Sequence, residues 1–298
     1  MLKNRIKLFV NNFLSFFNVK VVKLSLAGPY DLTKKKINPL TAQYFVGHNP
    51  IVINMNFEEG RSNRWFDMSQ NSLDPPIFAI KNALQKKLKG VDLYSNILSS
   101  LEHQQKLTIY KSAAEALDIE SFSNTKLKDY PWWAIVNPWD NLTFEDKMKS
   151  FPNEIKRNRA SNGMHILSND PDEIIKEDLK NSLPSHTNQY VKLLKQIKNN
   201  GFKYGNKYGY VTAEIFIADN ELRWKPGSEG NHRVAVAAAL GIKTIPVLIT
   251  KIIRLKELEY WPNVINGCFS KEQARKIFYN IFDAKPSKIY EEWIKKVS

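Results

Sequence analysis

The sequence of 298 residues predicts an α+β fold built on a compact mixed sheet with helices in residues 128–250. Two observations carry this prediction. The runs Val211–Ala218 and Leu222–Trp224 are rich in β-branched and aromatic residues and are typical of strands. A glycine turn, an alanine-rich helix and a third β-branched run, Ile245–Ile249, follow them. An α/β region precedes this unit and a helical tail follows it, which gives segments at 1–27, 28–127, 128–250 and 251–298.

The turn Pro226–Gly230 leads directly into the helix. It delivers Asn231, His232 and Arg233 to the first helical turn, and Gly241 stands after Leu240, where a left-handed cap is wanted. Glycine before a helix lets the backbone approach an anion, which the exposed N–H groups and the helix dipole then bind. Arg233 would form paired hydrogen bonds to a phosphate and His232 would donate to it as well. The alternative for Arg233 is a salt bridge to a carboxylate such as Glu229.

The motif Gly230-Asn231-His232-Arg233, the alanine-rich helix, Leu240-Gly241 and Ile245-Pro246-Val247 resemble, in that order, the signature of the ParB/sulfiredoxin-like superfamily. The likeness extends upstream to Tyr190–Gly201, which is similar to the family's helix that ends in glycine. It covers about residues 128–250. The resemblance implies a nucleotide-binding domain, with Gly230, Asn231, His232 and Arg233 around the phosphates of ATP or ADP, or of CTP.

Asn231 decides between branches of this superfamily. Sulfiredoxins carry their reactive cysteine directly before the His-Arg pair, whereas here the only cysteine is Cys268, so sulfinic acid reduction is excluded. ParB proteins continue into DNA-reading and dimerisation modules, for which the 48 residues after position 250 are too few. The loop is closest to that of the free serine kinases. The resemblance therefore implies a nucleotide-dependent phosphotransferase acting on a small hydroxylated molecule, and the alternative is a non-catalytic nucleotide switch or a ParB-like nucleic-acid-binding protein.

Phosphoryl transfer needs Mg²⁺, basic groups and a carboxylate that accepts the hydroxyl proton. Glu229 and Glu214 are the carboxylates nearest the motif in the inferred fold, Asp140 follows an expected strand at Trp132–Val136, and Glu154 is a fourth candidate. The sequence does not choose among them. It identifies no metal ligands.

Tryptophans surround the motif in the sequence. Trp132 and Trp133 are expected in the core, whereas Trp139 and Trp224 lie beside loops and could form a wall of a sugar or base site. The sugar would belong to envelope glycan assembly, an inference that also draws on the N-terminal segment. Residues 2–17 alternate Phe and Leu with Lys and Asn at helical spacing, which suits a helix in a membrane interface, with a packed helix or a signal peptide as alternatives. The expected location is cytoplasmic, peripheral to the inner face of the membrane.

The net charge of +14 favours anionic partners such as phosphorylated substrates, anionic lipid or nucleic acid. The basic residues are dispersed, so nucleic acid is not the expected partner, and the densest basic patch is Lys156, Arg157 and Arg159. A single cysteine excludes an internal disulfide framework and fits a reducing compartment.

The remaining elements follow from periodicity and capping. Ile51–Met55 predicts a strand, and Ile77–Leu88 and Ser99–Leu117 predict helices. In the tail, Ser270–Phe282 and Ser287–Lys296 predict helices with the two serines as N-caps, and the segment 261–264 separates them from the core. Thr143 and Asp146 resemble a capping box.

Overall fold

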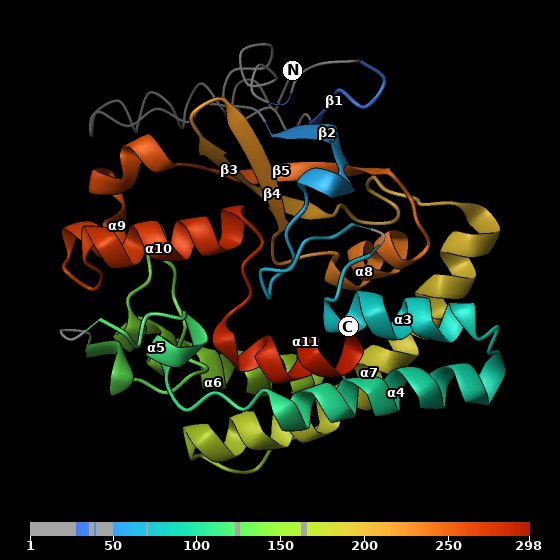
Figure 1. Cartoon of the computed structure of the whole chain (residues 1–298), viewed down its shortest axis with the longest axis horizontal. Helices are drawn as coiled ribbons and strands as arrows, with labels where there is room; N and C mark the ends of the chain where they lie inside the picture. The colour runs from blue at the N-terminus through green and yellow to red at the C-terminus, as the bar shows by residue number, and fades with distance from the viewer. Residues whose placement is uncertain (1–27, 36–38, 40–49, 70, 123–125, 162–165) are drawn as a thin grey trace, which may run out of the picture.

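The computed structural model describes residues 28–35, 39, 50–69, 71–122, 126–161 and 166–298. Its centre is a five-stranded mixed sheet in the order β1-β2-β5-β3-β4. The pairs β1/β2 and β3/β5 are parallel, and β2/β5 and β3/β4 are antiparallel. With helices packed around this sheet, the predicted α+β class is confirmed (Figure 1). The strands are Tyr30–Asp31, Ile51–Asn56, Thr212–Ala218, Glu221–Pro226 and Thr244–Arg254, numbered β1 to β5.

The strands predicted around the motif are all present, and β5 is longer than predicted. Its first half pairs with β2 from Thr244 to Ile249, and its second half pairs with β3 from Leu248 to Arg254. Two partners in succession keep the backbone extended past the point where the β-branched run ends. Because β2 lies in this sheet, the sheet also draws on residues before 128.

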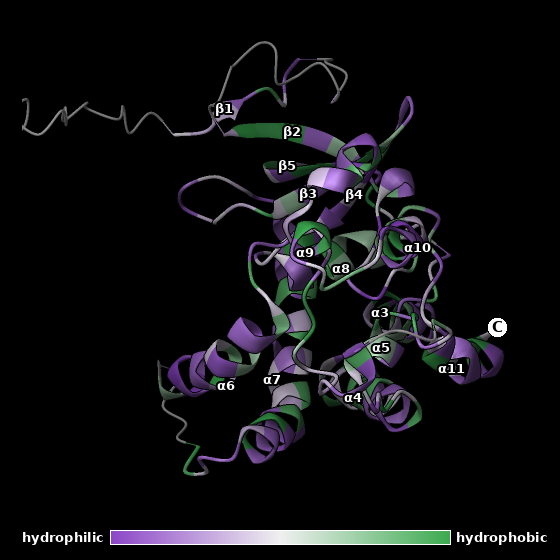
Figure 2. Cartoon of the chain, turned by 90° about the vertical axis from the view of Figure 1, so that its left-hand side faces the viewer, coloured by the Kyte–Doolittle hydropathy of each residue, from purple (hydrophilic) through white to green (hydrophobic). Residues whose placement is uncertain are grey.

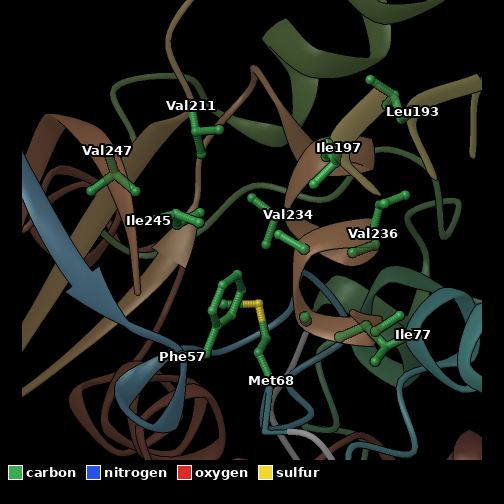
Figure 3. Packing of buried hydrophobic residues seen from close by; sticks show 14 of the residues in the cluster. Phe57, Met68, Ile77, Leu193, Ile197, Val211, Val234, Val236, Ile245 and Val247 are labelled. Atoms are coloured by element: carbon green, nitrogen blue, oxygen red, sulfur yellow. The ribbon is translucent and has the colours of Figure 1, made fainter. Parts of the chain in front are cut away.

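Helix α8, Asn231–Ala239, lies against one face of the sheet (Figures 1 and 2). It starts after Gly230 in the left-handed conformation, with φ of 87°, and ends before Gly241, which has the predicted positive φ of 74°. Its small side chains allow close packing on the sheet. Figure 3 shows Val234 of α8 directed toward Ile245 of β5 and toward Val211, the residue before β3.

The helices α3 (Pro75–Gln85), α4 (Gly90–Leu107) and α7 (Pro171–Asn200) complete the core on this face. The α7 helix contacts α8 along the side that carries Tyr190, Leu193 and Ile197, and it ends at Gly201, as predicted from the glycine. Asp170 caps its N-terminus by accepting from the N–H of Glu173.

The opposite face of the sheet is covered by α10, Lys271–Phe282. Ser270 and Gln273 form the capping box that begins this helix, which confirms the predicted cap. Phe278 of α10 packs with Phe216 of β3 and with Trp261, which is buried. The expectation that residues 261–264 separate the tail from the core is therefore wrong, because α10 is part of that core.

Shorter elements fill the periphery. Thr143 precedes α6, and its hydroxyl and N–H exchange hydrogen bonds with Asp146, so the resemblance to a capping box is confirmed. These elements are α5 (Ala113–Ala116), α6 (Phe144–Ser161), α9 (Pro262–Ile265), α11 (Glu291–Val297), and the 3₁₀ turns η1 (Phe57–Glu59), η2 (Lys126–Lys128), η3 (Leu255–Tyr260) and η4 (Lys288–Tyr290).

The predicted strand Trp132–Val136 is wrong. The segment is a series of turns, in which Ala134 donates its N–H to Pro131, and Trp133 is directed to a different cluster from Val136. This apolar run between two prolines has the composition of a strand. It does not form one, because no other described strand pairs with it. Trp133 is buried, as expected.

Trp139 and Trp224 are core residues, with 6% and 0% of their surface exposed. Trp224 donates its indole N–H to the carbonyl of Asn56, and Trp139 packs edge-on against Phe216 and Trp261. Neither tryptophan forms a site wall, which corrects that expectation.

Two helix boundaries differ from those predicted. The helix expected at Ser99–Leu117 begins nine residues earlier, at Gly90, and breaks at Thr108, after which α5 is separate. Ser287 begins the last segment, but its side chain makes no capping bond and its hydroxyl has no partner among the described residues. The segment 2–17 lies outside the described residues, and within the described part no helix is long and apolar enough to cross a membrane.

Replacement of Gly230 tests the docking of α8. A Cβ there would lie 2.7 Å from Cγ2 of Val211 and 3.0 Å from its Cα, so Gly230→Ala carries both the cost of positive φ and a backbone clash. We expect a loss of at least about 3 kcal/mol in the free energy of unfolding, measured with urea. Gly267 is the matched control, because it has φ of 77° but open space around it. Gly267→Ala should cost about 1–2 kcal/mol, and equal losses in the two variants would contradict the close approach.

Candidate functional site

The turn between β4 and α8 is fixed by Thr212 of β3. The N–H of Gly227 donates to the Thr212 carbonyl at 2.8 Å, and the N–H of Glu229 donates to its hydroxyl at 3.0 Å. In return the Thr212 N–H donates to the carbonyl of Glu229 at 3.2 Å. These bonds and the left-handed Gly230 hold the first turn of α8 in one orientation.

No side chain caps the N-terminus of α8, and the first N–H bonded within it is that of Val234, to the Gly230 carbonyl. The N–H groups of a first helical turn have no partner within their helix, and they carry the positive end of its dipole. The first turn of α8 therefore presents donors to an anion.

A second turn, from residues 62–66, lies against the start of α8. The amide of Asn63 donates to Oδ1 of Asn231 at 3.0 Å, and the amide of Asn231 donates to the Gly227 carbonyl at 3.2 Å. The hydroxyl of Ser62 accepts from the N–H groups of Arg64 and Phe66, both at 3.2 Å. The two turns are thus joined by side-chain amides.

Trp65 in this turn has φ of 68°, which is unfavourable for a residue with a Cβ. Its side chain is buried in the core that contains Phe216, and this burial holds the backbone in place. The preceding residue, Arg64, is thereby directed to a small cavity of about 50 Å³ between the 62–66 turn, α3 and α8. The polar lining includes Arg64, Asp74 and Asn231.

Arg64 and Asp74 form a partly buried ion pair, with Nη1 3.7 Å from Oδ2. Asp74 is 3% exposed, and Oδ2 accepts no hydrogen bond from the described residues. Burial raises the pKa of Asp74, and Arg64 offsets part of this. Burial opposes the charge of Arg64, but Asp74 outweighs it and the pKa of Arg64 is raised. The guanidinium is therefore permanently charged, and 38% of the side chain remains exposed.

His232 is half-buried and packs against two rings of α7. Its ring centroid lies 4.9 Å from that of His186 and 4.9 Å from that of Tyr190. Burial, followed by the charges of His186 and Arg64, lowers the pKa of His232 to about 4. Burial also lowers the pKa of His186. His232 is consequently neutral near pH 7, and it contributes a hydrogen-bonding ring and no charge.

Arg233 lies on the other side of α8 and contacts the backbone of a loop. Its Nη1 donates to the carbonyls of Tyr208 and Gly209, both at 3.0 Å, and Nη2 donates to the carbonyl of Tyr210 at 2.8 Å. Burial lowers the pKa of Arg233, and Glu229 partly offsets this. The sequence predicted a phosphate for this side chain, with an ion pair to Glu229 as the alternative, and its hydrogen bonds go instead to carbonyls.

Glu214 and Asp140 lie on the sheet face that α10 covers. Lys251 joins them, with Nζ 2.8 Å from Oδ1 of Asp140 and 3.8 Å from Oε1 of Glu214. Burial would raise the pKa of Asp140, but Lys251 and Asn137 lower it below its ordinary value. Both carboxylates are therefore neutralised by an ammonium group away from the cavity.

A chain of contacts still links this pair to α8. Lys225, 3.2 Å from Oε2 of Glu214, donates to Oδ1 of Asn63 at 3.3 Å, and Asn63 binds Asn231. Glu229 is the predicted carboxylate that is exposed directly beside the turn, and Glu154 is exposed on α6.

The sequence missed Asn63, Arg64 and Asp74. The available signal was the cluster Arg61-Ser62-Asn63-Arg64 after the strand β2, within a segment that reads as turns. Asp74 precedes Pro75-Pro76, a pattern that favours the start of a helix. This pattern gives no indication that Asp74 also pairs with Arg64.

A larger cavity, of about 750 Å³, lies elsewhere, between η2, the start of α6 and the segment before α10. It contains none of the predicted site residues. Its lining mixes Lys126 with Glu145 and Glu272, and it includes Cys268, whose thiol pKa is raised by burial. No group of three or more His, Cys, Asp or Glu side chains within the described residues could hold a metal ion.

Comparisons with protein-family models, with curated proteins and with solved structures found no match.

The low pKa of His232 predicts a pH dependence of stability. In the unfolded chain this histidine has its ordinary pKa of 6.5, so between about pH 6.5 and 4 the unfolded state binds more protons than the folded state. The free energy of unfolding should therefore fall as the pH falls through this window. His232→Gln should reduce that fall when urea unfolding is compared at pH 7 and pH 5. His103→Gln, at an exposed position on α4, should keep the dependence of the original chain. The same slope in both variants would contradict a neutral, half-buried His232.

Proposed function

We propose that this chain binds the phosphate groups of a nucleotide at the N-terminus of α8, with Arg64 as the charged ligand. The observation that carries the proposal is the uncapped first turn of α8 facing the same cavity as Arg64. Backbone donors, the helix dipole and a guanidinium are the three elements of a phosphate site. A chain with a net charge of +14 also attracts anionic ligands over long range.

The order strand, strand, glycine turn, helix, strand in β3, β4, α8 and β5 supports a nucleotide as the source of the phosphate. It is the order on which the resemblance to ParB/sulfiredoxin-like proteins rests. The proposed ligand is ATP, ADP or CTP. Mg²⁺ would enter with the nucleotide, because it is commonly bound through one or two carboxylates and the phosphates themselves.

Phosphoryl transfer to a small hydroxylated molecule is the second candidate. The observation that favours it is Glu229, an exposed carboxylate next to Gly230 that forms no ion pair with another described residue. Such a carboxylate can accept a hydroxyl proton, whereas Glu214 and Asp140 are each held by a lysine. In this candidate function the acceptor is a sugar of envelope glycan assembly. The protein would act in the cytoplasm, in contact with the membrane surface.

Replacement of Arg64 tests the phosphate site. Arg64→Ala should weaken nucleotide binding by about 1.5–3 kcal/mol in calorimetry, which is the scale of a charge-assisted hydrogen bond. Arg64→Lys should recover only part of this, because an ammonium lacks the planar fork.

Arg233 provides the matched comparison. Arg233→Ala leaves three loop carbonyls without a donor, so it should lower the free energy of unfolding by about 1–3 kcal/mol. A loss of nucleotide affinity in Arg233→Ala with none in Arg64→Ala would overturn the assignment of Arg64.

Replacement of Glu229 separates the two candidates. If phosphoryl transfer occurs, Glu229→Gln should lower turnover by about 10²–10⁴ with nucleotide affinity nearly unchanged. Transfer from radiolabelled ATP to serine and to sugars is the measurement. Glu221→Gln, an exposed glutamate on β4 that pairs with Arg223, is the control. Nucleotide binding with no transfer to any acceptor would leave the non-catalytic module as the function.

A further inference from the structure

The loop at residues 201–210 has the sequence Gly-Phe-Lys-Tyr-Gly-Asn-Lys-Tyr-Gly-Tyr, and the nucleotide proposal makes no use of its side chains. Its three glycines all have positive φ, of 71°, 101° and 72°. The N–H of Tyr208 donates to the carbonyl of Gly205 at 3.0 Å, and Gly205 and Gly209 form a bridge. The glycines therefore fold the loop into a compact turn.

The loop is anchored at both ends. Arg233 of α8 donates to the carbonyls of residues 208–210. The hydroxyl of Tyr204 donates to Oδ2 of Asp31 at 3.0 Å and lies 3.0 Å from the hydroxyl of Thr33. Because these bonds hold the backbone, the loop needs no ligand to become ordered, and little conformational entropy is lost when it binds one.

An aromatic ring stands at the surface of this loop near two ammonium groups. Tyr208 is 46% exposed, with the Nζ atoms of Lys203 and Lys207 at 5.4 and 5.6 Å from its ring centroid. An exposed aromatic ring with two ammonium groups close to it matches the combination of base and phosphate in a single strand of nucleic acid.

Tyr208 also lines a hollow of about 220 Å³, together with Phe202, Lys203, and Gln196 and Asn200 from the end of α7. Arg233 closes it on the side of α8. The aromatic groups supply stacking and the amides supply donors and acceptors for the edge of one base.

The positive surface continues along α7. Lys192, Lys195 and Lys198 are exposed and recur every three residues up to the loop. The chain contains no Asp or Glu from residue 179 to residue 213, and within the described residues none of these lysines or of the two loop lysines forms an ion pair. The patch predicted from sequence is less available, because Arg159 is paired with Asp178 at 2.6 Å and Lys156 bonds Asn169.

We propose that the loop 201–210 and the lysines at the end of α7 bind single-stranded nucleic acid, with Tyr208 stacking on a base and the lysines contacting phosphates. This goes beyond the nucleotide site, since it uses the side of α8 that carries Arg233. Phosphate contacts supply most of the affinity, and stacking makes the surface prefer unpaired strands.

The test is fluorescence anisotropy of the full chain with a labelled oligothymidylate of about 20 nucleotides. Lys203→Ala/Lys207→Ala should weaken binding about 25-fold at about 0.1 M salt and lower the salt slope by about 1.4, since each phosphate contact contributes about 0.7. Tyr208→Ala should weaken it about 5- to 150-fold, and Tyr208→Phe should not.

Lys86→Ala/Lys89→Ala removes the same charge from an exposed site between α3 and α4, and it should lose at most a few-fold. Arg64→Ala should bind oligothymidylate like the original chain, so the two proposals fail independently. The thermal unfolding midpoint of each variant is measured first, and binding affinities are compared only among variants whose midpoint equals that of the original chain. Equal losses in the two lysine pairs, an unchanged affinity in Tyr208→Ala, or binding to phosphatidylserine vesicles without binding to oligothymidylate would overturn the proposal.

Discussion

The close approach of Gly230 to Val211, the residue before β3, is the constraint on which the polar arrangement around α8 depends. Val211 leaves no room for a Cβ at residue 230, and Thr212 bonds the turn that precedes it. The first turn of α8 is therefore fixed relative to the sheet. The contact of Asn231 with Asn63 and the clamp of Arg233 on its loop both start from this fixed turn.

The charges at this turn are consistent with the proposed anion site. A guanidinium beside the positive end of a helix dipole is unfavourable unless a negative group compensates for it. Asp74 compensates for Arg64 only in part, because its nearest oxygen is 3.7 Å away and its own burial raises its pKa. The neutral His232 adds no further charge, so the proposed phosphate site contains one cationic side chain, Arg64, beside the start of α8.

Local signals in the sequence were sufficient for the unit from β3 to β5 and for the ends of α7, α8 and α10. Strand composition, Gly201, Gly230, Gly241 and the Ser270 cap each act through neighbours within a few residues, so single positions predict them. The site could not be predicted in the same way. Arg64 and Asp74 precede α8 by more than 150 residues in the chain, and only the sheet and the core bring them to it. Trp224 is a second example. Its position beside a loop in the sequence predicted a residue of a site wall, but the distant segment 57–61 packs over it and buries it completely.

The two proposed anion surfaces lie on different sides of one helix. Asn231 and Arg233 are two positions apart, which is roughly 200° around an α-helix. Asn231 consequently faces the cavity of Arg64, while Arg233 faces the loop that carries Lys203 and Tyr208. A single phosphate cannot contact both side chains, although both stand in the same four-residue motif. The sequence motif predicted Arg233 as the main phosphate ligand, but its residues face two different surfaces. The N-terminus of α8 belongs to the proposed nucleotide site, and Arg233 holds the backbone of the loop 201–210.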